Sequence, residues 1–314
     1  GGRVAGTAMT SPATTNGHVI RTRALTKRYG ELRAVDGVNL EVRAGDVYGF
    51  LGANGSGKTT TVRMLLGLVL PTSGEAEVLG MPMPTGRHSV LPRIGSLVES
   101  PAAYPHLSGS ANLALLDASG SDRSRREERR TRIGTALEQV GLDPGDRRPV
   151  RTYSQGMRQR LGLAAALMRQ PTLLILDEPS NGLDPHGIQE IRKLLLELNA
   201  EGTTIFLSSH LLAEIEQMCT HVGVLRDGRL ILQEELDTLM RPTGLVAVRT
   251  PDIEVCAELL GDVVASSADD RLLVRAEDPA RLNAYLVGEG VRVDEIGPYR
   301  RTLEEIVLEA EARA

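Results

Sequence analysis

Tryptophan is absent from this chain of 314 residues, and aromatic residues make up only 3% of it. The two cysteines, Cys219 and Cys256, lie far apart in sequence, which excludes a disulfide framework and predicts free thiols in a reducing compartment. No uninterrupted apolar run approaches the length of a membrane span, and the first residues lack the apolar core of a signal peptide. We therefore expect a cytoplasmic protein, for which any role at a membrane requires a partner.

Positive charge is not in excess either. The chain has a formal net charge of −5, with 41% hydrophobic and 25% charged residues. Affinity for the phosphate backbone of nucleic acids needs concentrated positive charge, so this composition argues against a nucleic-acid partner. A chain of this length can bury a full core, and it suggests one large or two smaller domains.

The chain changes character along its length. Residues 1–17 are small and polar and predict a disordered leader. Over 18–240, strand-like and helix-like segments alternate as they do in α/β proteins, with a mainly helical stretch at about 92–168. That stretch contains a run of mixed charge, residues 122–130, which predicts a solvated helix face.

A different pattern begins after Pro242-Thr243-Gly244. The strand-like and helix-like segments that follow are, in order, 245–250 (strand), 253–260 (helix), 263–266 and 271–276 (strands), 279–287 (helix) and 291–296 (strand). This βαββαβ order predicts a small ferredoxin-like α+β domain at 244–314. Thr302 and Glu305 form a capping box, which predicts a final helix.

A glycine-rich segment that ends in lysine and threonines is the most informative feature. It follows the apolar run 47–51 and precedes the helix-compatible residues 61–66, which is the strand–loop–helix order of a P-loop. Glycines permit unusual backbone angles, and N–H groups at a helix N-terminus attract phosphate oxygens. Lys58 would neutralise the β- and γ-phosphates, and the Thr59 hydroxyl would bind Mg²⁺.

The residues predicted to wrap the nucleotide are therefore Gly52, Ala53, Asn54, Gly55, Ser56, Gly57, Lys58, Thr59 and Thr60. The alternative is a glycine-rich turn that arose by chance and binds nothing. A P-loop alone predicts only a nucleotide, so the reaction has to be inferred from other segments.

Two acidic residues follow the buried-strand run 173–176. The tips of parallel strands face the ligand crevice, so Asp177 would hold Mg²⁺ through water and Glu178 would polarise the attacking water. The alternative is an ordinary helix N-cap, which the presence of the P-loop disfavours. A second such run, residues 203–207, predicts another buried strand of the same sheet.

A third segment, residues 153–160, precedes the apolar helical run 161–168. The Ser154 hydroxyl, with Gln155 and Gly156 behind it at a helix N-terminus, makes a second anion site. An ordinary capped helix is the alternative reading of this segment on its own.

Taken in order, these motifs make the chain resemble the ATP-binding subunit of an ABC transporter over about residues 18–240. Residues 52–60 are similar to the Walker A motif, 154–160 to the signature motif and 173–178 to the Walker B motif. The resemblance implies an α/β fold, a P-loop NTPase domain of the ABC ATPase type with an inserted helical subdomain. The small C-terminal α+β domain follows it.

The resemblance also implies roles for single residues. Asp184, in a segment similar to the D-loop, would face the opposite subunit, and His210, similar to the switch histidine, would contact the γ-phosphate and water. Tyr29 would stack on adenine, although a strand-edge tyrosine remains the alternative. Lys58, Glu178 and His210 are thus the expected catalytic residues.

Two positions depart from the family pattern. Gln155 stands where the signature usually has glycine, whereas Ser154 and Gly156 are retained. Glu99 stands where the family usually has glutamine, and as a carboxylate it would add to Mg²⁺ ligation by Thr59 and Asp177. If the alignment is off by one residue, Glu99 is merely solvated. Residues 100–107 are similar to the bacitracin- and lantibiotic-type exporters.

The family therefore implies a homodimer in which each ATP, with Mg²⁺, lies between the P-loop of one subunit and Ser154 of the other. It also implies a separate integral-membrane permease, at whose inner face the subunit would sit, and export of an antibiotic, peptide or lipid. Two other classes stay open at this point. One is a soluble ABC-type regulatory switch, and the other is a P-loop small-molecule kinase, which leaves residues 154–160 without a role.

Overall fold

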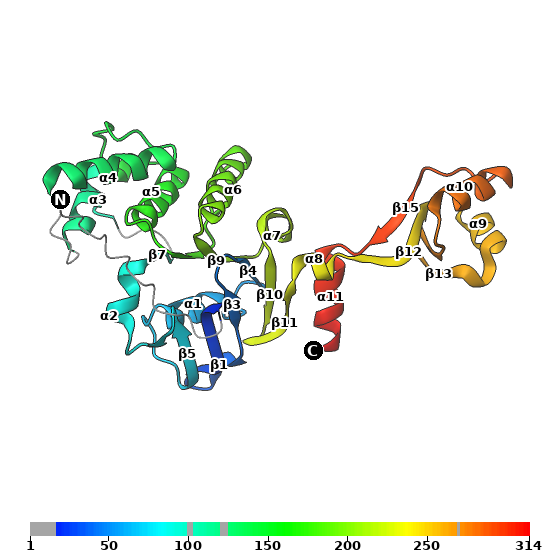
Figure 1. The fold of residues 1–314 in the computed structure, drawn as a ribbon, viewed down its shortest axis with the longest axis horizontal. Helices are drawn as coiled ribbons and strands as arrows, with labels where there is room; N and C mark the ends of the chain where they lie inside the picture. The colour runs from blue at the N-terminus through cyan, green and yellow to red at the C-terminus, as the bar shows by residue number, and fades with distance from the viewer. Residues whose placement is uncertain (1–16, 99–102, 120–124, 269–270) are drawn as a thin grey trace, which may run out of the picture. The chain divides into compact units, whose positions relative to one another are not determined.

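The structure, a computed structural model, describes residues 17–98, 103–119, 125–268 and 271–314 (Figure 1). The chain divides into two compact units, with the division between Glu234 and Glu235. The predicted leader at 1–17 lies almost wholly outside the described residues. Within the described ranges, no helix combines the length and the apolar character that a membrane span needs.

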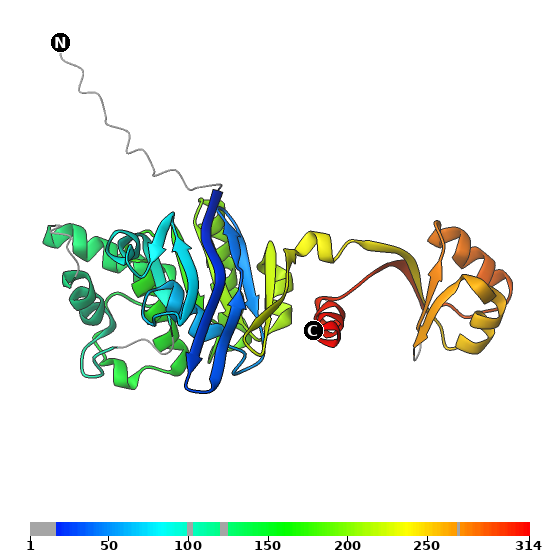
Figure 2. The same cartoon turned by 90° about the horizontal axis from the view of Figure 1, so that it is seen from below.

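The first unit contains an antiparallel sheet in which the long strand β1 pairs with three others (Figure 2). Its order is β2-β1-β5-β6, and β3 also pairs with β1. The strands are β1 (His18–Tyr29), β2 (Leu32–Val38), β3 (Glu41–Arg43), β5 (Ser73–Val78) and β6 (Met81–Met83).

The second sheet of this unit is mainly parallel and has the order β11-β10-β4-β9-β8-β7. Its strands are β4 (Val47–Leu51), β7 (Ile94–Leu97), β8 (Leu173–Asp177), β9 (Thr204–Ser209), β10 (His221–Arg226) and β11 (Arg229–Glu235). Strands β4, β8 and β9 are buried along their whole length, which confirms the two predicted buried strands. Helices α1 (Lys58–Leu65), α6 (Pro185–Ala200) and α7 (Leu212–Met218) pack against these strands.

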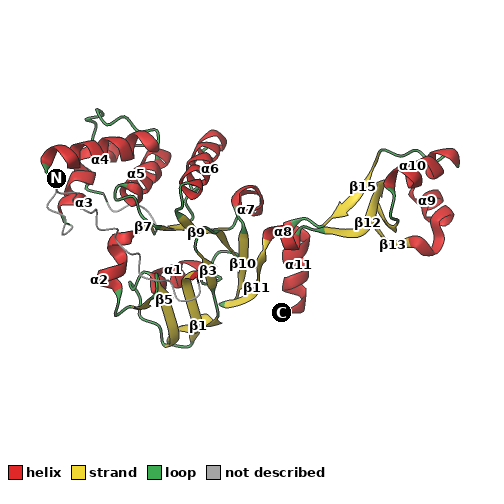
Figure 3. Cartoon of the chain, in the orientation of Figure 1, coloured by secondary structure: helices red, strands yellow, loops and turns green. Residues whose placement is uncertain are grey.

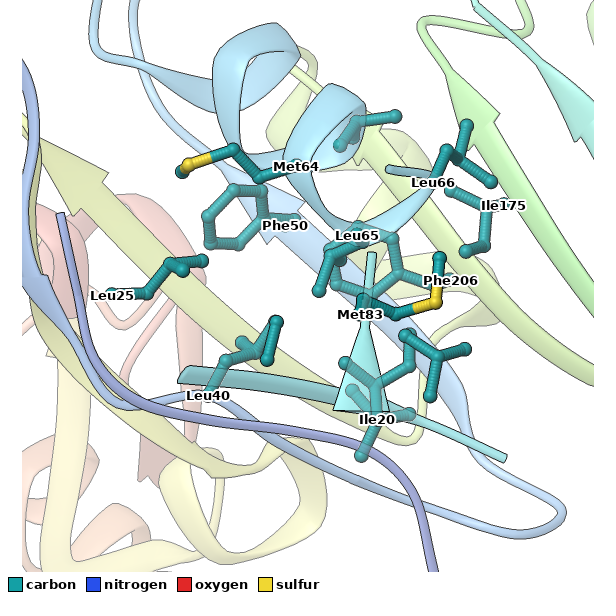
Figure 4. Packing of buried hydrophobic residues seen from close by; sticks show 14 of the residues in the cluster. Ile20, Leu25, Leu40, Phe50, Met64, Leu65, Leu66, Met83, Ile175 and Phe206 are labelled. Atoms are coloured by element: carbon teal, nitrogen blue, oxygen red, sulfur yellow. The ribbon is translucent and has the colours of Figure 1, made fainter. Parts of the chain in front are cut away.

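One apolar core joins the two sheets through α1. Figure 4 shows Leu65 of α1 close to Phe206 of β9, with Ile20 of β1 on the other side. Phe206 also packs against the rings of Tyr48 and Phe50, at centroid distances of 5.6 and 5.4 Å. The helix that begins at Lys58 is therefore fixed by a core that lies directly beneath it, because close packing leaves little room for it to shift.

A helical segment follows β7, as Figure 3 shows by the grouping of α3, α4 and α5. Its elements are α3 (Gly109–Ala118), α4 (Arg126–Gln139), the short 3₁₀ turn η3 (Val150–Thr152) and α5 (Gln155–Leu167), whereas α2 (Arg87–Val90) and the 3₁₀ turn η2 (Leu91–Arg93) precede β7. The run 122–130, of which 122–124 lie outside the described residues, was predicted to be solvated. The described residues 125–128 and 130 are exposed, as predicted, whereas the guanidinium of Arg129 lies 2.8 Å from the fully buried carboxylate of Asp117. Arg132 pairs with the same carboxylate at 2.9 Å, since a buried charge requires paired partners.

The second unit has the predicted βαββαβ order, and its antiparallel sheet has the order β13-β14-β12-β15. Its elements are α8 (Leu236–Leu239), β12 (Pro242–Arg249), α9 (Ile253–Leu260), η4 (Gly261–Val263), β13 (Val264–Ala268), β14 (Arg271–Arg275), α10 (Pro279–Gly288), β15 (Glu295–Arg300) and α11 (Leu303–Arg313). This is the arrangement of a ferredoxin-like α+β fold.

The last strand of this unit differs from its prediction at 291–296. The pairing with β12 begins at Glu295, whereas Val291 is buried in the core of the unit without being part of a strand. The apolar residues at the start of the predicted strand therefore pack in the core of the unit, and they do not pair with β12. The capping box is confirmed, because Thr302 N–H donates to Glu305 at 3.0 Å and Glu305 N–H donates to Thr302 Oγ1 at 3.2 Å.

The two thiols give a first prediction. Cys219 and Cys256 are both free and buried, and desolvation raises the pKa of each thiol. Because the thiolate is the reactive form, we expect both to react with a disulfide reagent slowly in the folded protein and rapidly in denaturant. Absorbance of the released chromophore measures both rates. A thiol that reacts in the folded protein as fast as in denaturant would contradict this burial.

Candidate functional site

The glycine-rich loop lies between β4 and α1, as the sequence predicts for a P-loop. Gly57 has a φ of 108°, and a Cβ added to it would collide with the carbonyl oxygen of Ala34. Ala53, Asn54 and Gly55 are exposed, so their backbone N–H groups are accessible to a ligand. Ser56 Oγ is buried and has no hydrogen-bond partner within the described structure. The loop therefore offers accessible donors and an unpaired hydroxyl, which suits an anionic ligand.

Lys58 is held inside this loop. Its side chain is 6% exposed, and Nζ donates to the carbonyl oxygens of Gly52 and Ala53 at 2.6 and 3.3 Å. Nζ also lies 3.3 Å from Glu178 Oε1. A positive charge this well buried needs such partners, and it interacts strongly with any further anion that enters the loop.

Asp177, at the end of β8, joins three elements. Thr59 Oγ1 of α1 donates to its Oδ2 at 2.7 Å, and Ser208 Oγ of β9 donates to its Oδ1. The parallel register places Asp177 directly opposite Ser208. Carboxylate and hydroxyl oxygens are the ligands that Mg²⁺ prefers, and the ion takes its remaining ligands from phosphate and water.

The site therefore fits Mg²⁺ only together with a nucleotide. Among the residues that the structure describes, no group of three or more His, Cys, Asp or Glu side chains could hold a metal ion without help. Glu99, predicted as a further ligand, lies outside the described residues.

Glu178 places its two oxygens against two different side chains. Oε1 faces Lys58, and Oε2 lies 2.7 Å from Nδ1 of His210. The backbone of Glu178 is in the left-handed region with a φ of 50°, which is costly for a residue with a side chain. Strain of this kind persists only where surrounding contacts enforce it, and here Glu178 N–H is held by Ser208, at 3.1 Å from its Oγ and 3.2 Å from its carbonyl oxygen.

These five predicted residues, Lys58, Thr59, Asp177, Glu178 and His210, are brought together around one point. A cleft of about 640 Å³ opens beside them, and Thr59, Asp177 and Glu178 form part of its lining. Charge of both signs thus surrounds an accessible space at the N-terminus of α1. This arrangement can bind a polyphosphate and hold a water molecule near it.

Of the other predicted residues, Gln155 lines the same cleft, whereas Ser154, Asp184 and Tyr29 have their contacts elsewhere. Ser154 caps α5, where its Oγ accepts from the N–H of Met157 at 3.1 Å, and Asp184 caps α6 by accepting from Gly187 N–H at 3.1 Å. Tyr29 ends β1 with its side chain 47% exposed, and Lys27 Nζ lies 5.0 Å from its ring centre. Each is accessible to a ligand or a partner, but within one chain these three make local contacts.

Sequence reasoning missed three residues that support the site. They are Ser208, which holds Asp177, Glu214, which accepts from Ser180 Oγ at 2.7 Å, and Gln159, which donates to the carbonyl oxygens of Glu178 and Pro179. Ser208 lies at a strand tip beside the acidic pair, and that position could have identified it. For the other two, no local pattern in the sequence signals the contact.

The backbone of the loop gives a second prediction. Gly57→Ala should destabilise the protein more than Gly55→Ala, although both positions have positive φ, 108° and 82°. The left-handed conformation costs about 1–2 kcal/mol in either variant, but only at Gly57 would the new Cβ meet a neighbouring atom, the Ala34 carbonyl oxygen. Urea unfolding without nucleotide, followed by circular dichroism, measures the difference. Equal losses would mean that the loop does not pack against Ala34.

Comparison with known proteins agrees with this geometry. The model of the family described as ABC transporter matches residues 35–181. The chain is 47% identical over 224 residues to the bacitracin transport ATP-binding protein BcrA of Bacillus licheniformis, covering 71% of this chain and 72% of that protein. It is 38% identical over 296 residues to BcrA of Enterococcus faecalis, covering 92% and 94%. The dimeric structure of MJ0796, a bacterial ABC transporter cassette, matches with a TM-score of 0.65 and 27% identity, covering 69% of this chain and 98% of that one.

Proposed function

Because this chain belongs to the ABC transporter family of ATP-binding subunits, we propose that it hydrolyses ATP to power export through a separate membrane permease. The observation that carries the proposal is the convergence of Lys58, Asp177 and Glu178 beside the P-loop. The likeness to two bacitracin transport proteins supports an antibiotic, a peptide or a lipid as the exported molecule. On this proposal, 18–240 is the ATP-binding domain, with its helical subdomain at about 92–168, and 244–314 is an accessory domain.

The chemistry proposed for the site is positioning and neutralisation of charge. Lys58 binds the phosphate oxygens in place of its present contact with Glu178 Oε1, so that oxygen becomes available to orient the attacking water. His210 holds the other oxygen of Glu178 and lies where it can contact the γ-phosphate. Thr59 and Asp177 would hold Mg²⁺, which when bound neutralises phosphate oxygens.

We further propose that two copies of the chain share each ATP. Ser154 lies at the exposed N-terminus of α5, where the helix dipole and free N–H groups favour an anion, yet it caps only its own helix. The γ-phosphate of an ATP bound to a second copy would accept hydrogen bonds from the N–H groups at this helix N-terminus. The dimeric MJ0796 structure supports such an assembly, in which Asp184 and Tyr29 would contact the partner and the adenine.

The membrane role follows from the same relatives. Their names describe transport ATP-binding proteins, so we place this chain at the inner face of the cell membrane, attached to an integral-membrane permease. A stand-alone regulatory switch finds no support among these relatives. A small-molecule kinase would leave the anion site at Ser154 without a role.

The variant Glu178→Gln tests the reaction. It keeps the size of the side chain and the contact with Lys58 through the amide oxygen, but it removes the carboxylate that would orient water. We expect ATP binding to be retained and hydrolysis to fall about 10²- to 10⁴-fold, the usual contribution of a general base. Phosphate release measures turnover, and binding of a fluorescent ATP analogue measures affinity.

The same variant traps the dimer. With Mg-ATP, Glu178→Gln should elute as a dimer, whereas Glu178→Gln/Ser154→Asp should remain monomeric. Aspartate preserves the helix cap but places a negative charge against the phosphate, so the control separates the phosphate contact from helix stability. Light scattering during gel filtration gives both masses. Undiminished hydrolysis in Glu178→Gln, or dimers in the Asp variant, would contradict the proposal.

Association with a permease is the remaining prediction. The chain should co-purify with a membrane protein encoded beside its gene, and bacitracin should stimulate ATP hydrolysis by the complex in lipid vesicles. A panel of lantibiotic peptides and lipids serves for comparison, because the cargo is chosen by the membrane protein. If none of these compounds stimulates a complex that does hydrolyse ATP, antibiotics, peptides and lipids of this kind are ruled out as cargo.

A further inference from the structure

The side chain of Gln155 lies over the backbone of Gly182 in the same chain. A Cβ built on Gly182 would lie 2.5 Å from Gln155 Cδ and 2.6 Å from both Cγ and Nε2. No side chain other than hydrogen is compatible with that contact unless Gln155 moves away. Gly182 also has a φ of 79°, so the segment bends there in a conformation that suits glycine.

One turn further along α5, Gln159 contacts the same segment. Its Nε2 donates to the carbonyl oxygen of Glu178 at 3.2 Å and to that of Pro179 at 3.0 Å. Residues four apart lie on one face of a helix, so Gln155 and Gln159 present their amides to residues 178–182 side by side. Both hydrogens of the Gln159 amide are used by backbone acceptors.

The contacted segment includes the backbone of the proposed water-orienting residue. Glu178 has a φ of 50°, and such a conformation persists only where neighbours hold it. On one side Ser208 holds its N–H, and on the other both Gln159 and the N–H of Asn181 donate to its carbonyl oxygen, each at 3.2 Å. Helix α5 therefore contributes one of the contacts that set the direction of the Glu178 side chain towards Lys58 and His210.

We propose that Gln155 and Gln159 are positioning residues that link the N-terminus of α5 to residues 178–182 of the same chain. The inference rests on the proposed function, in which Ser154 at this N-terminus binds the partner's ATP. Binding of ATP at one site then sets the backbone of Glu178 at the other site.

This link also accounts for the departure of Gln155 from the usual glycine. Glycine would bring no side chain to residue 182, whereas glutamine fills the space that the missing Cβ of Gly182 leaves. The two positions are complementary, a large side chain at 155 and none at 182. Their effects on turnover should therefore depend on each other.

The first experiment replaces Gln159 by Leu, which keeps much of the volume and removes both hydrogen bonds. We expect kcat to fall about tenfold to a hundredfold through misplacement of Glu178, with KM for ATP unchanged, because the hydrogen bonds of Gln159 go to the backbone of Glu178 and Pro179 and not to residues 52–60. An unchanged kcat, or a loss that appears only in KM, would overturn the proposal.

The second experiment is a double-mutant cycle. Gly182→Ala should lower kcat about tenfold when residue 155 is Gln, and by a smaller factor in the Gln155→Gly background, where the clash is absent. The strain of positive φ is common to both backgrounds and cancels in the comparison. Gly202→Ala is the matched control, since Gly202 has a φ of 100° with no atom near its added Cβ. That variant should leave kcat unchanged.

Equal effects of Gly182→Ala in the two backgrounds would overturn the role of Gln155. Failure of this proposal can be told apart from failure of the proposed function. The Glu178→Gln variant should form a dimer in Mg-ATP whether or not Gln155 and Gln159 position residues 178–182. If that dimer forms and the cycle is additive, only the link is wrong. If the dimer does not form, the shared site itself is wrong.

Discussion

The hydrogen bonds of Asp177 are the interaction on which the site depends. One carboxylate receives the hydroxyl of Thr59 from α1 and the hydroxyl of Ser208 from β9, and it stands at the tip of β8. Three elements that are distant in sequence are thereby fixed at one point. Loss of this carboxylate would leave two hydroxyl groups without their acceptor, at about 1–3 kcal/mol for each one that stays buried, and would remove this hydrogen bond between the P-loop helix and the sheet.

The strand register makes this arrangement possible. In the parallel sheet Asp177 is opposite Ser208, and Leu51 is opposite Ser209, so β4, β8 and β9 end at the same level. The loops that follow these strands therefore carry Lys58, Glu178 and His210 to one place. The core around Phe206 packs against these strands and keeps their ends aligned with one another.

Helix α5 connects the exposed Ser154 with the backbone that carries Glu178. Its first turn presents Ser154 to the surface, and the same turn and the next contact residues 178–182 through Gln155 and Gln159. On the proposed function, the group that would bind the partner's ATP and the groups that would position Glu178 are thus on one rigid element. Because a helix moves as a body and a packed interface is not freely deformable, displacement at one end is felt at the other.

Local patterns predicted much of the fold and of the site. The P-loop was evident because glycine, lysine and threonine have to lie within a few residues of each other to bind phosphate. The capping box at Thr302 was evident for the same reason, since both of its hydrogen bonds span three residues. The strands before Asp177 and His210 were evident from their apolar runs, residues 173–176 and 205–207.

Contacts between distant segments were not predicted. Arg129 lies in a run that a sequence assigns to solvent, and only the folded chain brings the buried Asp117 to it. The last strand of the second unit pairs from Glu295, because sheet register depends on the neighbouring strand and not on the apolar residues alone.

By itself, then, the sequence determined which chemical groups the chain carries. The phosphate-binding motif and the acidic motif are each one continuous stretch of residues, so each can be recognised without the fold. The tertiary structure alone decided which side chains hold those motifs in place, such as Ser208, Gln159 and Glu214. Those choices depend on strand register and helix packing between residues far apart along the chain, which no local pattern encodes.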